Sequence, residues 1–274
     1  MPRKRLTQIF PFLLPLRKWQ RKRFFYLKMR LDGNRYARRA APDLLKHVMF
    51  EASSPMLNPN SGFDMRYQEN KVHNLRLAAR TLDHILIRPG ETFSFWQLVR
   101  HADRREKYKD GLELVGGRIV GAYGGGLCQM SNLLFWLFLH TPLTLIERHG
   151  HKVEAFPSTA EDLPCGTDAT IHEGWLDLKV KNETSRTYQL EITLDGGNLT
   201  GRIRAGRAAE EDCRVYNGEV AYWREGGRTY QRATVDRNVR NRATGEERQE
   251  RLYTNVCEIG YPLPPEIIVE ERGD

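Results

Sequence analysis

The longest apolar run of the chain follows directly after a turn of three glycines. Residues 133–139 read Leu-Leu-Phe-Trp-Leu-Phe-Leu, without the polar stripe of an amphipathic surface helix. The pattern predicts a helix from about Gln129 to His140 that is buried on all sides. Thr141-Pro142 ends it, because proline cannot continue a helix interior. The glycine turn, residues 124–126, allows a tight entry and places Cys128 in the first helical turn.

Shorter periodic runs predict the elements around this helix. Apolar residues recur at helical spacing over residues 68–85, and Ser, Pro and Asn mark residues 51–62 as a loop. Strand-like runs cover residues 92–96, 116–121, 143–148, 152–156, 167–171, 176–181, 189–194 and 199–203. Asp195-Gly196-Gly197-Asn198 predicts a hairpin turn, and Asn217-Gly218 and Gly226-Gly227 predict further hairpins.

Together these elements predict an α+β fold in which the buried helix packs on a mostly antiparallel sheet. With 274 residues, 40% of them hydrophobic, the chain has the composition of a soluble globular protein. We expect a basic aromatic N-terminal arm over residues 1–40, a central domain over 41–205, and a C-terminal extension rich in β-hairpins over 206–274.

The positive charge of the chain is concentrated in the arm. Residues 1–40 hold thirteen Lys and Arg against the single acid Asp32, so the formal total of +8 leaves about −4 for the remainder. Aromatic side chains interleave with these cations, a mixture that suits an anionic membrane surface. The alternative is a solvated helix docked on the body by its aromatics. Nucleic acid is not expected as a partner, because no recognised module accompanies the arm.

The same arm bears on location. The apolar run at residues 9–16 is too short to cross a bilayer and is broken by Pro11 and Pro15. It also lacks the small-residue cleavage site of a secretory signal. The expected location is therefore cytoplasmic, with the arm peripheral at the inner membrane face.

The candidate chemistry starts from Cys128. The four cysteines show no CxxC spacing, and a chain of this length folds without disulfides, so reduced thiols are expected. A cysteine at a helix N-terminus meets the positive end of the helix dipole, which favours the thiolate. His149, His151 and Asp168 follow in the order nucleophile, base and orienting group of papain-like thiol enzymes. In an extended segment both imidazoles would address one site.

Further residues complete the predicted site. Gln129 and the amides of the glycine turn are candidate oxyanion donors. The full set of candidate ligand contacts is Gly124, Gly125, Gly126, Gln129, Ser131 and Arg148.

Other interpretations of the same residues stay open. Cys128 has the character of a buried structural residue, and Asp168 that of a turn cap. Thiolate, two imidazoles and a carboxylate also form a plausible zinc set, but their spacing matches no common zinc signature. We therefore expect neither a metal nor a cofactor.

Several separated motifs resemble the VanW family over roughly residues 70–205. They are Asn74 with its helix, Arg88-Pro89-Gly90-Glu91-Thr92-Phe93-Ser94-Phe95, Gly124-Gly125-Gly126-Leu127-Cys128-Gln129-Met130-Ser131, Glu147-Arg148-His149-Gly150-His151 and Gly166-Thr167-Asp168-Ala169. The resemblance implies association with the bacterial cell envelope and an accessory role in vancomycin resistance, without a settled biochemical activity.

Three hypotheses follow from the residues and the resemblance together. The first is a thiol-dependent enzyme that acts on a peptide or amide bond of peptidoglycan or its precursors. The second is a non-catalytic module that binds a cell-wall precursor or peptide. The third is an envelope scaffold in which the cysteine is merely buried.

Overall fold

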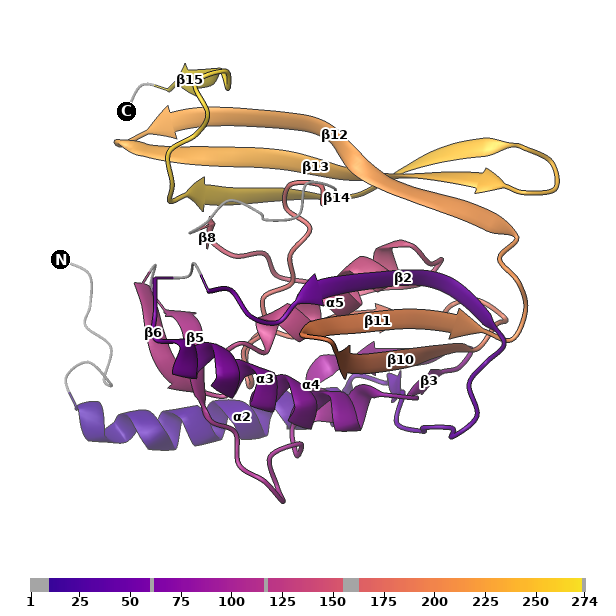
Figure 1. The fold of residues 1–274 in the computed structure, drawn as a ribbon, viewed down its shortest axis with the longest axis horizontal. Helices are drawn as coiled ribbons and strands as arrows, with labels where there is room; N and C mark the ends of the chain where they lie inside the picture. Colours follow the sequence, from indigo (N-terminus) through magenta and orange to yellow (C-terminus); the bar gives the residue numbers. More distant parts are fainter. Residues whose placement is uncertain (1–9, 60–61, 116–117, 155–162, 273–274) are drawn as a thin grey trace.

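The buried helix α5 (Cys128–Leu139) lies at the centre of the fold (Figure 1). The computed structural model describes residues 10–59, 62–115, 118–154 and 163–272. Eight of the twelve residues of α5 are buried, from Met130 to Leu139, as the apolar run predicts. The other helical segments are η1 (Pro11–Leu13), α2 (Leu14–Leu31), α3 (Met65–Leu82) and α4 (Phe95–Val99).

An antiparallel sheet carries α5. Its strand order is β2 (His47–Pro55), β11 (Asn198–Ala205), β10 (Tyr188–Asp195) and β3 (Leu86–Ile87). Gly201 of β11 lies under the helix, and a Cβ there would stand 2.8 Å from Leu137 Cδ1. The missing side chain therefore lets helix and sheet approach closely. The predicted α+β class, the hairpin at residues 195–198 and the antiparallel sheet are confirmed.

A second, smaller sheet lies beside this layer. Its order is β1 (Arg35–Tyr36), β4 (Glu91–Ser94), β9 (Lys179–Lys181) and β7 (Thr144–Glu147). Only β1 and β4 run parallel. The predicted strand at residues 92–96 ends early, because Ser94 Oγ accepts a hydrogen bond from the Gln97 backbone N–H at 3.2 Å and begins α4.

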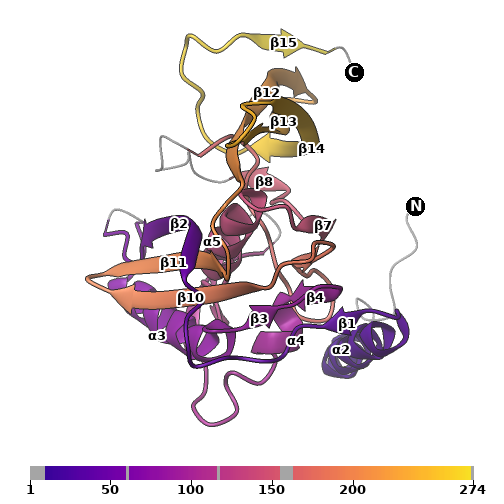
Figure 2. The ribbon, with the colours of Figure 1, turned by 90° about the vertical axis from the view of Figure 1, so that its right-hand side faces the viewer.

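The C-terminal region forms most of a third sheet, which Figures 1 and 2 show at one side of the body. Its order is β15 (Val269–Glu271), β12 (Glu211–Glu225), β13 (Arg228–Asn241), β14 (Glu247–Ile259) and β8 (Val153–Glu154). Gly226-Gly227 forms the predicted hairpin turn between β12 and β13. Asn217-Gly218 does not form a turn. It lies within β12, where the register shifts between Asn217 and Val220.

Three other sequence predictions require correction. Residues 51–55 belong to strand β2 rather than to a loop, and the hydroxyls of Ser53 and Thr200 pair across the strands at 2.8 Å. Residues 167–171 form no strand, because side chains and loop carbonyls take their backbone hydrogen bonds. The strand predicted over residues 116–121 runs on to Tyr123 as β6 (Arg118–Tyr123), with residues 116–117 outside the described part. It pairs with β5 (Asp110–Val115), a strand that was not predicted. Of the predicted strand 152–156, Val153–Glu154 form β8, Lys152 precedes the strand, and residues 155–156 lie outside the described part.

Helix α2 docks on the body by one face and exposes the other. Tyr26 Oη donates to Glu173 Oε1 at 2.7 Å, and Lys22 Nζ lies 2.6 Å from Glu173 Oε2. On the other face Trp19 and Phe24 are 55% and 67% exposed, and Phe12 of the preceding η1 is 75% exposed. The interpretation of the arm as a helix docked on the body is therefore correct for one face of α2. Across the described residues, no helix has both the length and the apolar character needed to span a bilayer.

Candidate functional site

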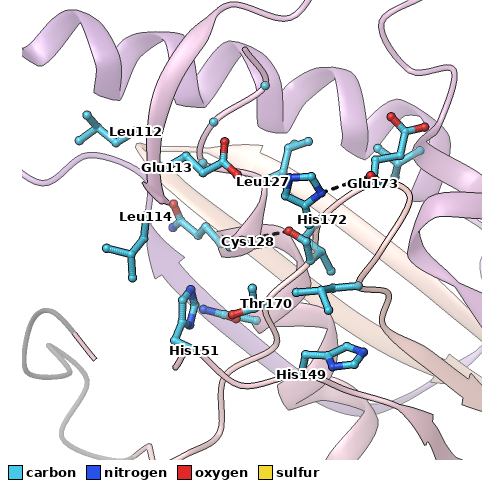
Figure 3. Close-up of a pocket in the computed structure, with 18 of the residues that line it drawn as sticks. Leu112, Glu113, Leu114, Leu127, Cys128, His149, His151, Thr170, His172 and Glu173 are labelled. Atoms are coloured by element: carbon cyan, nitrogen blue, oxygen red, sulfur yellow. Dashed lines mark hydrogen bonds between the residues drawn. The ribbon is translucent and has the colours of Figure 1, made fainter. Parts of the chain in front are cut away.

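A cleft of about 1330 Å³ opens where α5 begins (Figure 3). One wall comes from α3 and the β5–β6 hairpin, and the opposite wall comes from residues 148–153 and 170–176. The glycine turn and Cys128 lie between the two walls. The residues predicted as one site from their motifs therefore share one cavity, although they come from distant parts of the chain.

Asn74 of α3 holds the glycine turn in place. Its Nδ2 donates to Gly125 O at 3.0 Å and to Lys109 O at 2.9 Å, and its Oδ1 accepts from Lys109 N at 2.8 Å. Gly124 and Gly126 take φ values of +75° and +92°, which L side chains rarely adopt. This bracing positions Cys128 as the first residue of α5.

His151 lies between Asp168 and Cys128. Its Nδ1 is 2.5 Å from Asp168 Oδ2, and its backbone N–H donates to the same oxygen at 2.6 Å. The Cys128 thiol lies close enough to this imidazole to raise its pKa, while its own hydrogen bond goes to Ile171 O at 4.0 Å. The structure thus brings the predicted nucleophile, one predicted base and the predicted orienting group into a single chain of contacts.

The electrostatics of this group favour a charged imidazole. Burial by itself lowers the pKa of His151, but the interactions with Asp168 and Cys128 outweigh it and raise the pKa to about 10. Burial acts to raise the pKa of Asp168, yet its contacts with His151 and Arg148 hold that pKa below its usual range. At neutral pH the pair therefore consists of a carboxylate and an imidazolium.

Arg148 fixes Asp168 from the opposite side. Its Nη2 donates to Asp168 Oδ1 at 2.6 Å and to Gly166 O at 2.7 Å, while Nε donates to Asp168 O at 2.6 Å. Its Nη1 donates to Asn255 Oδ1 of β14 at 2.8 Å. The guanidinium also lies over the Tyr253 ring, 4.7 Å from its centroid. Arg148 thus acts as a support of the catalytic candidates, with 8% of its side chain exposed.

His149 has different partners. Its Nε2 lies 3.1 Å from Glu147 Oε1, and Glu147 also accepts from Lys179 at 2.8 Å. Figure 3 shows the His149 ring pointing away from Cys128. Both imidazoles line the cleft, but only His151 bonds Asp168, and residues 148–151 form no extended strand that would align the two rings.

The predicted ligand contacts divide into two groups. Gly124, Gly125, Gly126, Gln129 and Arg148 line the cleft. The Gln129 side-chain amide donates to Ser54 Oγ at 2.9 Å and to Pro55 O at 2.8 Å. Because both N–H groups are engaged, Gln129 cannot donate to an oxyanion in this arrangement.

Ser131 does not reach the cleft. It is fully buried and donates to Ala169 O at 2.6 Å, which ties α5 to the Asp168 loop. Its prediction as a ligand contact is therefore wrong, because the second turn of α5 already faces the core.

The remaining cysteines lie in different surroundings. All four are free thiols. Burial raises the pKa of Cys165 and Cys213, and burial with nearby carboxylates raises that of Cys257 to about 12. No group of three or more His, Cys, Asp and Glu within the described residues is placed to hold a metal ion.

Sequence reasoning missed two sets of residues. Asn255 and Tyr253 support the Asp168 loop from β14, and no local pattern marks them. Gln68 and Lys71 line the cleft from α3. The periodicity of the sequence predicts this helix, but it does not predict that the face with these two residues borders the cleft.

Comparison with known proteins is consistent with the motifs. A family model described as VanW like protein matches residues 70–204. The vancomycin B-type resistance protein VanW of Enterococcus faecalis (strain ATCC 700802 / V583) is 52% identical over 274 residues, all of both chains. The uncharacterized protein YoaR of Bacillus subtilis (strain 168) is 28% identical over 157 residues, which are 57% of this chain and 49% of that one. No solved structure matches.

Proposed function

This chain belongs to the VanW family, which is linked to vancomycin resistance, and we propose that it is a thiol-dependent enzyme acting on peptide or amide bonds. The observation that carries the proposal is the position of His151, hydrogen-bonded to Asp168 and close enough to the Cys128 thiol for the thiol to raise its pKa. This arrangement matches the logic of an activated nucleophile, its acid–base partner and an orienting carboxylate.

The reaction assigns one role to each residue. The Cys128 sulfur, as thiolate, attacks the carbonyl carbon and forms a C–S bond while the carbonyl electrons move to oxygen. First-turn amides of α5 are suited to stabilise that oxyanion. The C–N bond then breaks, and the proton of the His151 imidazolium passes to the leaving amine, which leaves a thioester.

Water completes the cycle. The imidazole, now neutral, takes a proton from the attacking water, and the thioester C–S bond breaks to release the acid and the Cys128 thiolate. An amine in place of water would give transfer instead of hydrolysis. Asp168 stays ionised throughout and holds the imidazole through Nδ1, where it stabilises the imidazolium form.

Peptidoglycan or its precursors are the proposed substrates. A full-length relative carries a name that refers to vancomycin resistance, and the family resemblance implies association with the bacterial cell envelope. The cleft volume, about 1330 Å³, is sufficient for several linked residues of a peptide chain.

The test is incubation of the protein with soluble stem peptides released from peptidoglycan, followed by mass spectrometry of peptides and protein. We expect new peptide products, together with an acyl mass on Cys128 that hydroxylamine removes. Cys128→Ser should abolish both, whereas Cys165→Ser, a matched change in a half-buried thiol, should retain both. Ligand-dependent thermal stabilisation that survives Cys128→Ser, without products from either protein, would favour the alternative of a non-catalytic binding module.

We also propose that η1 and the exposed face of α2 rest on an anionic membrane surface. Phe12, Trp19 and Phe24 are 75%, 55% and 67% exposed beside a dense set of Lys and Arg. Cations attract anionic headgroups and aromatic rings insert at the interface. Replacing these three aromatics by Ser should abolish sedimentation with vesicles containing anionic lipid, and added salt should weaken it. Undiminished binding of the triple variant would contradict this contact.

A further inference from the structure

Three polar groups on the cleft wall formed by α3 and the segment that leads into β5 have no hydrogen-bond or ionic partner among the described residues. Lys71 makes no ion pair or hydrogen bond with the described residues, and burial lowers its pKa to about 8 without a carboxylate to offset it. Gln68 is 5% exposed and its Oε1 lacks a partner. The buried Tyr108 hydroxyl lacks one as well. Buried polar groups are normally hydrogen-bonded, so these three are candidate contacts for a ligand.

The three groups gather around the glycine turn. Gln68 and Lys71 are three residues apart on α3 and share one face of the helix. The Lys71 stem lies against Gly126, where an added Cβ would stand 2.3 Å from Lys71 Cγ. The Tyr108 ring lies 3.5 Å from the corresponding position at Gly124. The unpartnered groups therefore border the same turn that presents Cys128.

Their chemistry selects the ligand. An ammonium and a phenolic hydroxyl are donors that suit a carboxylate, and a free primary amide offers the donor and the acceptor that a peptide group requires. Three other cations of the cleft have partners, since Arg148 binds Asp168, Lys22 binds Glu173 and Arg100 lies over the Tyr26 ring. Lys152 is exposed on the opposite wall, away from α3.

We propose that Lys71 and Tyr108 form a subsite for a carboxylate of the substrate, while Gln68 pairs with the neighbouring peptide group. This assignment rests on the proposed function, because it places an acidic peptide beside the Cys128 nucleophile. It restricts the substrate class to peptides that carry a free carboxylate close to the bond that is attacked. A substrate without this carboxylate would offer no negative charge to complement Lys71.

Two alkylating reagents test the subsite without turnover. Iodoacetate and iodoacetamide react with Cys128 to add groups of nearly the same size, and only the first carries a carboxylate. We expect Lys71→Met to lower the iodoacetate-to-iodoacetamide rate ratio at Cys128 by roughly threefold, the size of one partly solvated charge pair. Lys71→Arg keeps the charge and should retain most of the ratio. Arg76→Met, an exposed change on the same helix outside the cleft, should leave the ratio unchanged.

A second measurement keeps the unmodified protein. N-acetyl-glycylglycine should protect Cys128 from iodoacetamide at lower concentration than its C-terminal carboxamide does. A ratio unaffected by Lys71→Met, together with equal protection by acid and amide, would overturn the subsite. A Cys128 that is unreactive toward both reagents would instead contradict the proposed function, so the two failures are distinguishable.

Discussion

Replacing Asp168 by Asn removes the charge that holds the His151 imidazolium while preserving the size of the side chain. The pKa of His151 is raised to about 10 from an ordinary 6.5, with the Asp168 hydrogen bond first among the contacts that raise it. That difference of about 3.5 units corresponds to roughly 5 kcal/mol of preference for the charged ring. The share that Asp168 supplies is lost in the variant, so we expect the pKa of His151 to fall by at least about one unit.

The sign of the stability change follows from the same shifts. A histidine with a raised folded-state pKa stabilises the fold fully below pH 6.5 and loses that contribution as pH rises through about 10. Asp168 has a lowered pKa, so its contribution is present above its unfolded value of 3.8 and disappears as pH falls further. Both contributions are complete near pH 6. Asp168→Asn should therefore lower the free energy of unfolding there, by roughly 3 kcal/mol, because Arg148 is left without its carboxylate.

The assay is a titration of the His151 ring nitrogens by nitrogen-15 NMR, assigned by comparison with His151→Gln. Glu147→Gln is the matched control, because Glu147 bonds His149 and does not bond His151. It should leave the His151 midpoint unchanged. A His151 that titrates near pH 6.5 in the unmodified protein, or a midpoint that Asp168→Asn does not move, would refute the reasoning.

Three further predictions concern the frame of the site. Asn74→Ala breaks three hydrogen bonds around the glycine turn and should cost roughly 2 to 4 kcal/mol in urea unfolding; an unchanged midpoint would contradict that bracing. Gly126→Ala places a Cβ against Lys71 at φ +92° and should lower the melting temperature more than Gly227→Ala, an open turn at φ +72° that should cost about 1 kcal/mol; equal losses would count against the packing. Burial raises the pKa of Asp177 to about 7, so stability should fall as pH rises from about 4 to 7. Asp177→Asn should flatten that slope in thermal unfolding, and an equally steep slope would exclude Asp177 as its source.

Local patterns predicted the parts of the site that depend on neighbouring residues. The unbroken apolar run identified α5, and the adjoining glycines placed Cys128 at its start. Turn chemistry identified the hairpin at residues 195–198. Strand β2 was misread because its Ser and Pro residues resemble a loop, while its pairing with β11 depends on residues about 150 positions away.

Long-range contacts set the remainder. The choice between His149 and His151 depends on Asp168, which bonds His151 and does not bond His149. The local sequence around the two histidines does not indicate which of them Asp168 contacts. Asn255 bonds Arg148 across 107 positions, so no local sequence pattern at either residue predicts the pairing. Lys71 lies on a helix that periodicity predicts, yet only the placement of the β5–β6 hairpin makes its face a cleft wall.

The most direct test of the account is the rate of Cys128 alkylation by iodoacetamide near neutral pH, followed by peptide mass spectrometry. The unmodified protein, His151→Ala and His149→Ala are compared, with Cys165 and Cys213 as internal references. We expect Cys128 to react faster than both references, His151→Ala to slow it by roughly tenfold or more, and His149→Ala to leave it nearly unchanged. A Cys128 that reacts no faster than the references, or that responds equally to both substitutions, would contradict the Cys128–His151 pair.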